Sequence, residues 1–225
     1  MAFQLNNVVP WGRNLEEYQM MFQLDESDIS KKIAGFGDGP ASFNYEATQK
    51  GYSVTSFDPI YQFTKEQLQQ RIEETRVTVM KQMEENTDSF VWTNIKNLDE
   101  LEDIRMSAMK VFLEDYEKGK QEKRYIYHEL PEGLSIEDNT FDIGLSSHFL
   151  LMYTALGYDF HIQAISEMLR VCKEVRIFPL LDLAGEDSEM IQDVIQYFKE
   201  KYTVEIRDTE YEFQKGGNKL LVIKK

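Results

Sequence analysis

The sequence predicts an α/β protein with a doubly wound, mostly parallel sheet, and three observations carry this prediction. A short apolar strand at 33–34 runs into a glycine-rich turn and then a helical segment. A second, β-branched strand at 53–57 follows one helix later and ends in a carboxylate. From 124 to 225, strand-like and helix-like runs alternate. Alternation with connections long enough for a helix is typical of parallel sheets built from βαβ units.

The composition is that of one folded domain. With 225 residues, 42% hydrophobic, we expect a single domain spanning 1–225 with a substantial core. A net charge of −15 makes nonspecific binding to nucleic acid or to an anionic membrane unfavourable. No apolar run approaches the length of a membrane span, and a single cysteine, Cys172, indicates a reducing compartment. We therefore expect a cytoplasmic protein, either a monomer or a homodimer.

Residues 1–30 precede the first strand and are predicted to form a helical cover. Asn14 and Glu17 have the spacing of a capping box that opens a helix. Just before it stand Trp11 and Arg13. One interpretation is that this segment covers a hydrophobic flank of the domain. The other is that Trp11 and Arg13 fold over the pocket of a cofactor, where Arg13 would bind the cofactor by pairing with a carboxylate.

The glycine turn has three glycines at alternate positions, Gly35, Gly37 and Gly39, followed by Pro40. Glycine permits positive φ angles and lets a ligand approach the backbone. Proline is favourable in a first helical turn, so we expect a helix from Pro40 to Gly51. The free N–H groups at the start of that helix would then point toward one place.

The spacing of these glycines separates two nucleotide-binding patterns. A dinucleotide fingerprint would need its third glycine at Pro40, so that interpretation is rejected. The G-x-G-x-G run instead resembles motif I of the class I S-adenosylmethionine-dependent methyltransferases. The alternative is a glycine-rich turn without a ligand. The resemblance implies S-adenosyl-L-methionine as cofactor, and places in its site Gly35, Phe36, Gly37, Asp38 and Gly39.

Asp58 ends the second strand, 23 residues after Gly35. A carboxylate there can accept both hydroxyl hydrogens of a ribose. The resemblance implies this role for Asp58, with Pro59 beside it; the alternative is an Asp that caps a turn before proline. One position departs from the family, in which an acid usually stands two residues before the first glycine. Here that position is Ile33, so contact with the methionine ammonium would have to come from Asp38 or a backbone carbonyl.

Residues 59–123 are too long for one crossover connection. Thr64 with Gln67, and Asn97, indicate two capped helices, the second ended by Gly119. This insertion is either a helical elaboration of the core or a lid beside the pocket, because it would stand over the carboxyl ends of the strands.

Residues 124–129 and 141–147 read as the third and fourth strands. The sequence between and after them closely resembles the corresponding stretch of small-molecule methyltransferases. That resemblance implies contacts to the adenine from His128, Glu129 and Leu130, and a pocket lining under the methyl group from Ser146, Ser147 and His148. His148 is a candidate general base, but it could equally fix its loop or contact the cofactor. Tyr153 is a weaker candidate for orienting the substrate.

The remaining segments complete the sheet. A helix at 158–171 leads to a strand at 174–178, a second helix ends near 198, and strands follow at 203–206 and 220–223. The final hairpin resembles the methyltransferase sheet, which implies seven strands with an antiparallel last strand.

We therefore expect a methyltransferase that acts on a small molecule by O- or N-methylation. The chain has no cluster with metal-site spacing, and no [DN]-P-P-[YF] motif after the fourth strand. Two alternatives stay open. The first is a noncatalytic binding module, which Ile33 favours. The second is methylation of RNA or protein, which would be favoured by a basic face made of Lys118, Lys120, Lys123 and Arg124.

Overall fold

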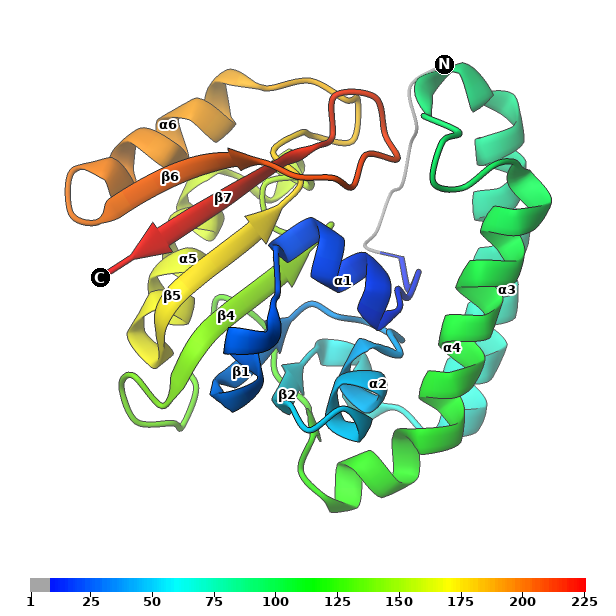
Figure 1. Ribbon diagram of the computed structural model, residues 1–225, viewed down its shortest axis with the longest axis horizontal. Coiled ribbons are helices and arrows are strands. Elements are labelled where there is room, and N and C mark those ends of the chain that lie inside the picture. The colour runs from blue at the N-terminus through cyan, green and yellow to red at the C-terminus, as the bar shows by residue number, and fades with distance from the viewer. Residues whose placement is uncertain (1–8) are drawn as a thin grey trace.

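The computed structural model describes residues 9–225, which form one seven-stranded sheet (Figure 1). The strand order is β3-β2-β1-β4-β5-β7-β6, and β7 runs antiparallel to both of its neighbours. All other pairs are parallel. The predicted fold class is therefore confirmed. The strands are β1 Lys32–Phe36, β2 Ser53–Phe57, β3 Tyr125–Ile126, β4 Phe141–Ser147, β5 Cys172–Phe178, β6 Thr203–Asp208 and β7 Lys219–Lys224.

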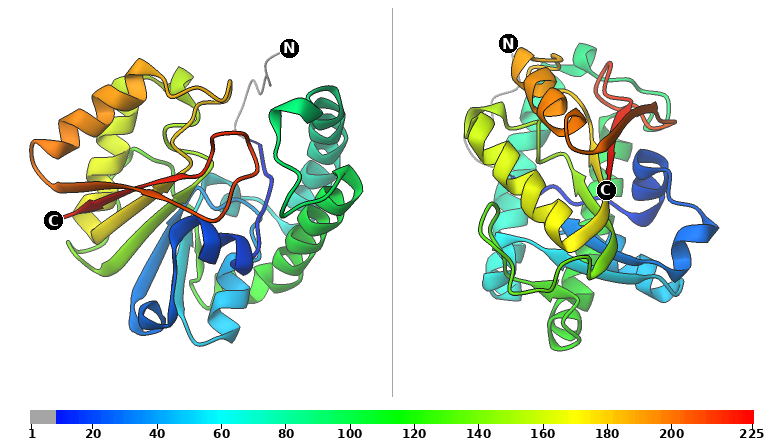
Figure 2. Two further views of the ribbon diagram at one scale, coloured as in Figure 1. Left: turned by 45° about the horizontal axis from the view of Figure 1, so that its top comes forward. Right: turned by 90° about the vertical axis from the view of Figure 1, so that its left-hand side faces the viewer.

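Alternating side chains of the central strands build two cores, one on each face of the sheet. Ile33 of β1 joins the core under α1 (Leu15–Phe22) and α2 (Phe43–Gln49), whereas its neighbour Ala34 joins the opposite core. That second core lies under α5 (Tyr158–Val171) and α6 (Glu189–Lys199). Figure 2 shows the two helix pairs on opposite faces. The strand order reverses between β1 and β4, which is where such sheets bind ligands.

The predicted insertion is a pair of long helices, α3 (Lys65–Glu85) and α4 (Leu98–Gln121), which stand beside the sheet (Figure 1). Their connecting segment meets the β6–β7 loop. The Val91 N–H donates to the Phe213 carbonyl at 2.7 Å, and the rings of Phe90 and Phe213 stack with centroids 4.9 Å apart. The connection between α3 and α4 is thus attached to the β6–β7 loop.

Two local predictions about helix ends were wrong. The helix after the glycine turn begins at Phe43, with Ser42 as its N-cap, so Pro40 lies in the turn and not in the first helical turn. Helix α4 continues past Gly119 to Gln121. A Cβ on Gly119 would come within 2.3 Å of the Tyr125 ring, so this glycine makes room for packing and does not end the helix.

The capping boxes at Asn14–Glu17 and Thr64–Gln67 are confirmed. Residues 1–8, part of the expected N-terminal cover, lie outside the described residues. Short 3-10 turns complete the chain: η1 Glu26–Ser30, η2 Pro59–Gln62, η3 Thr87–Ser89 and η4 Thr154–Leu156. Within residues 9–225, no helix combines the length and the apolar character needed to cross a membrane.

Candidate functional site

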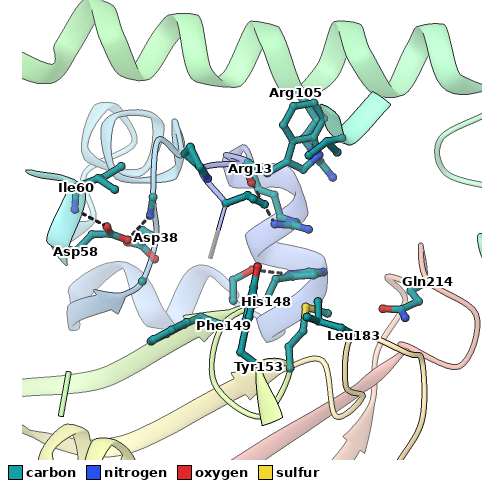
Figure 3. Close-up of a pocket in the computed structure, with 18 of the residues that line it drawn as sticks. Arg13, Asp38, Asp58, Ile60, Arg105, His148, Phe149, Tyr153, Leu183 and Gln214 are labelled. Carbon is teal, nitrogen blue, oxygen red and sulfur yellow. Dashed lines mark hydrogen bonds between the residues drawn. The ribbon is translucent and has the colours of Figure 1, made fainter. Parts of the chain in front are cut away.

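A cavity of about 380 Å³ lies at the carboxyl ends of β1, β2 and β4. Its walls come from the segment before α1, the turns after these strands, both helices of the insertion and the β6–β7 loop. Figure 3 shows Asp38 and Asp58 on one side of this cavity, and Arg13, Arg105, His148 and Gln214 on the other. We call these two sides the acid end and the basic end.

At the acid end the glycine turn and Asp58 meet directly. The Gly39 N–H donates to Oδ2 of Asp58 at 2.8 Å, and the Ile60 N–H donates to Oδ1 at 2.9 Å. Asp58 is the N-cap of η2, so it does cap a turn before proline, as one of the two interpretations expected. Gly37 and Gly39 have φ angles of +73° and +60°. These conformations strongly favour glycine, which agrees with the positive φ angles predicted for this turn.

Asp38 is held inward, beneath the turn. Its carboxylate accepts the Tyr18 hydroxyl at 2.8 Å and the Ser56 hydroxyl at 2.6 Å. A Cβ on Gly35 would lie 1.8 Å from Oδ2 of Asp38, so Gly35 is needed to accommodate this side chain. Burial raises the pKa of Asp38 to about 7 and that of Asp58 to about 6, although hydrogen bonds to both carboxylates oppose the shift.

His148 occupies a strained turn directly after β4. Its φ is +53°, an uncommon conformation for a residue other than glycine. The turn is fixed by the His148 N–H, which donates to the Phe178 carbonyl at 2.7 Å, and by a 2.9 Å contact between Nδ1 and Oγ of Ser147. Burial, together with the charges of Arg13 and Arg105, lowers the pKa of His148 well below its ordinary value. Its imidazole is therefore neutral at pH 7.

Arg105 of α4 is the main residue of the basic end that the sequence analysis missed. It is fully buried, and its Nη1 donates to Oε2 of Glu17 at 2.6 Å. The Tyr211 hydroxyl donates to Oε1 of the same carboxylate at 2.8 Å. This buried cluster ties the insertion to α1 and to the segment after β6. A charged residue at a helical position shared with Leu101 and Ala108 was the signal that could have found it.

Most of the predicted site residues line the one cavity, and three do not. Those that line it are Arg13, Gly37, Asp38, Gly39, Asp58, Pro59, His128, Glu129, Leu130, Ser147, His148 and Tyr153. Gly35 and Phe36 belong to strand β1, and Phe36 packs on Phe57 in the core. Ser146 is buried on the other side of β4 from Ser147, because neighbouring strand residues face opposite ways. The structure thus places these three residues outside the lining of the cavity.

His128 and Tyr153 approach the cavity from different ends. His128 is buried edge-on against Phe57, its Nε2 has no hydrogen-bond partner among the described residues, and burial lowers its pKa. Tyr153 lies beside the basic end (Figure 3). Burial raises the pKa of Tyr153, against the effect of the Val9 N–H and the charge of Arg13.

Three of the four basic residues near the end of α4 have partners within the chain. Arg124 is buried and makes two hydrogen bonds to Asp115, at 2.7 and 2.8 Å. Lys118 and Arg124 each pair with Glu122, and Lys120 lies over the ring of Tyr116. Among residues 9–225, no group of three or more metal-binding side chains is placed to hold an ion.

Comparison with known proteins identifies one close relative. Over 223 residues the chain is 38% identical to the uncharacterized protein MJ0045 of Methanocaldococcus jannaschii, with 98% of each chain covered. The chain belongs to that protein's family. No family model matches the sequence.

Several solved structures of S-adenosylmethionine-dependent methyltransferases are similar at low identity. One from Methanosarcina mazei is 15% identical, with 90% of this chain and 94% of that chain covered, and a TM-score of 0.46. One from Aquifex aeolicus is 11% identical, with 92% and 90% covered and a TM-score of 0.41. The fold of the present chain is defined by its own strand order.

Proposed function

We propose that this protein is an S-adenosylmethionine-dependent methyltransferase that acts on a small molecule by O- or N-methylation. The observation that carries the proposal is the convergence of Gly39 and Asp58, joined by a 2.8 Å hydrogen bond, on a cavity that His148 also lines. A ligand at the carboxyl ends of β1 and β2 would thus extend toward the end of β4. The resemblance of the glycine turn to methyltransferase motif I supports the same assignment.

The acid end fits an adenosyl group. A Cβ on Gly39 would meet no atom within 4 Å, so the backbone there is open to a ligand. Each Asp58 oxygen accepts one backbone N–H, which leaves a lone pair on each for a ribose hydroxyl. The unpartnered Nε2 of His128 offers a hydrogen-bonding atom for the base. Phe149 packs against Gly37, so the open path runs over Gly39.

Ile33 is buried in the core and supplies no acid for the cofactor's ammonium. Asp38 lines the cavity, and we propose that its carboxylate takes this role. Because burial raises the pKa of Asp38 to about 7, its carboxyl group becomes charged in the neutral pH range. Cofactor affinity should then rise between pH 6 and 8, as Asp38 and Asp58 both become charged.

Bound S-adenosylmethionine supplies a methyl group on a sulfonium, and the chain's contribution is to place a nucleophile in line with it. His148 is neutral, and its Nε2 makes no hydrogen bond among the described residues. In the tautomer whose Nδ1–H donates to Oγ of Ser147, Nε2 can accept the proton of an acceptor hydroxyl or amine. The contact between Nδ1 and Ser147 holds the ring in place.

The test is calorimetric titration with S-adenosylhomocysteine. Asp58→Ala should weaken binding by about 100-fold, because two hydrogen bonds to a charged acceptor are lost. Asp208→Ala, on exposed β6, is the matched control and should bind as the unchanged protein does. If the unchanged protein does not bind, or if Asp58→Ala binds equally well, the proposal fails.

A noncatalytic binding module remains the second candidate, because the buried Ile33 replaces an acid. Binding of S-adenosylhomocysteine without methyl transfer to any of a set of small hydroxyl and amine acceptors would favour it. The paired cations near Arg124 give no support to an RNA substrate.

A further inference from the structure

The basic end of the cavity carries an excess positive charge. Arg13 comes from the segment before α1 and Arg105 from α4, and both line the cavity. Arg105 is balanced by Glu17 at 2.6 Å. Arg13 makes one hydrogen bond among the described residues, from Nη1 to the Trp11 carbonyl at 3.3 Å, and no ion pair there. The charge of Glu17 acts on Arg13 as well as on Arg105, so among the described residues one carboxylate faces two guanidiniums and one positive charge is in excess.

The same end holds hydrogen-bond donors without acceptors. Three buried N–H groups have no partner among the described residues, and all three belong to side chains that line the cavity: Trp11 Nε1, Arg13 Nε and Arg105 Nε. Buried polar groups in native proteins are nearly always paired. Three unpaired donors beside one excess positive charge indicate a ligand group that has several acceptor oxygens and a negative charge.

The surroundings of these donors describe the rest of the ligand. Figure 3 shows Arg13 between Arg105 and His148, away from Asp58. The adjoining wall is largely apolar and comes from the insertion and the β6–β7 loop, with Met83, Phe90 and Phe213. A molecule seated here would place an anionic group against Arg13 and an apolar body against this wall.

We propose that the basic end binds the anionic group, a carboxylate or a phosphate, of a methyl acceptor with an apolar body. This inference rests on the proposed function only in calling the bound molecule a methyl acceptor. The anion site itself is defined by the chain's own residues. Arg13 is then a specificity-determining residue for the acceptor, in place of the cofactor contact expected from the sequence. Arg105 and Trp11 supply further donors to the same group.

The test is calorimetric titration with three probes of similar shape: benzoate, phenyl phosphate and neutral benzamide. Each is measured with and without saturating S-adenosylhomocysteine. We expect at least one of the two anions to bind at least about 10-fold more tightly than benzamide. Whichever anion binds more tightly shows whether the site prefers a carboxylate or a phosphate. Benzamide binding equal to both anions, or no binding of either anion, would overturn the proposal.

Arg13→Gln should weaken the bound anion by about 10-fold or more, whereas Arg71→Gln on the exposed side of α3 should change nothing. Trp11→Phe keeps an aromatic ring and removes one donor, so a smaller loss of about 3-fold is expected. Thermal unfolding of each variant without ligand checks that it is folded. Unchanged anion binding in folded Arg13→Gln would refute the assignment.

A final comparison separates the acceptor from the cofactor. 5′-Methylthioadenosine lacks the amino-acid part of S-adenosylhomocysteine. If Arg13 held the cofactor's carboxylate, Arg13→Gln would weaken S-adenosylhomocysteine but not 5′-methylthioadenosine, and that result would overturn the proposal. We expect both to bind Arg13→Gln as they bind the unchanged protein. If neither S-adenosylhomocysteine nor 5′-methylthioadenosine binds the unchanged protein, the proposed function fails. The anion titrations then still test whether the basic end binds an anion.

Discussion

The two ends of the cavity bury carboxylates in opposite ways. At the acid end, Asp38 and Asp58 have only uncharged hydrogen-bond donors, so burial raises the pKa of these groups to about 7 and 6. At the basic end, burial would likewise raise the pKa of Glu17, but Arg105 outweighs it and the pKa is lowered. A neighbouring guanidinium, and not burial, thus decides whether a carboxylate here is a fixed charge.

This contrast suggests different tasks for the two ends. The acid end keeps carboxylate oxygens available beside an open backbone, which suits the hydroxyl and ammonium groups of the proposed cofactor. The basic end is permanently charged and has N–H donors without partners among the described residues, which suits an anion. Four changes to the chain would break or sharpen this comparison.

Removing Arg105 should have the largest effect on stability. Arg105→Met leaves the Glu17 carboxylate buried without its ion-pair partner, which should lower the free energy of unfolding by about 3–5 kcal/mol. Urea denaturation measures it, with Arg71→Met on exposed α3 as the control. Adding Glu17→Gln to Arg105→Met should restore part of the loss. If Arg105→Met were as stable as the control, the ion pair would not organise the basic end.

Asp38→Asn tests the acid end through the pH dependence of stability. The folded state holds the Asp38 proton up to about pH 7, whereas the unfolded chain releases it near its ordinary value. Between these two values the folded state binds more protons, so the stability contributed by Asp38 decreases as pH rises from about 4 to 7. Asp38→Asn removes this decrease. Between pH 5 and 8 its free energy of unfolding should fall by about 1–3 kcal/mol less than that of the unchanged protein. Equal slopes in urea denaturation would contradict the raised pKa.

Gly39→Ala tests whether the open backbone at the acid end contacts a ligand. Both Gly39 and Gly216 have positive φ, so an alanine at either should cost about 1 kcal/mol of stability. Of these two glycines, Gly39 lines the cavity and Gly216 does not. Gly39→Ala should therefore weaken S-adenosylhomocysteine by about 10-fold, or about 1.4 kcal/mol, while Gly216→Ala leaves the affinity unchanged. Equal affinities of the two variants in calorimetry would place the ligand elsewhere.

The smallest expected effect is on His148. Arg13 and Arg105 both lower its pKa, so Arg13→Gln should raise the titration midpoint by up to about one pH unit. NMR titration of the three histidines, with His148→Asn for assignment, measures this shift. Asparagine tolerates the positive φ at this position. A midpoint that does not move would show that Arg13 lies too far from His148 to share one ligand.

The acid end could be predicted from the sequence because its signal is local. Gly37, Gly39 and Asp58 lie within one βαβ unit, where a strand, a turn and a carboxylate have a fixed spacing. It was harder to predict which residues of β1 and β4 face the cavity. Phe36 and Ser146 were assigned to the site because the exact ends of strands, and hence the side to which a residue points, do not follow from pattern alone.

The basic end could not be assembled from the sequence, because its parts are far apart along the chain. Glu17 and Arg105 are 88 residues apart, and Glu17 and Tyr211 are 194 apart. Arg13 was recognised as a candidate. The second arginine of the basic end, Arg105, comes from the insertion, whose position depends on tertiary packing. The capping boxes at Asn14 and Thr64 fixed where the helices begin, and not where they dock.

A crystal structure of the protein with S-adenosylhomocysteine tests the central claim most directly. The account predicts both ribose hydroxyls within about 3 Å of the Asp58 carboxylate, and the Arg13 guanidinium free of the cofactor and facing the remaining space. A ribose bound at the basic end, or an adenosyl group outside the cavity, would contradict it.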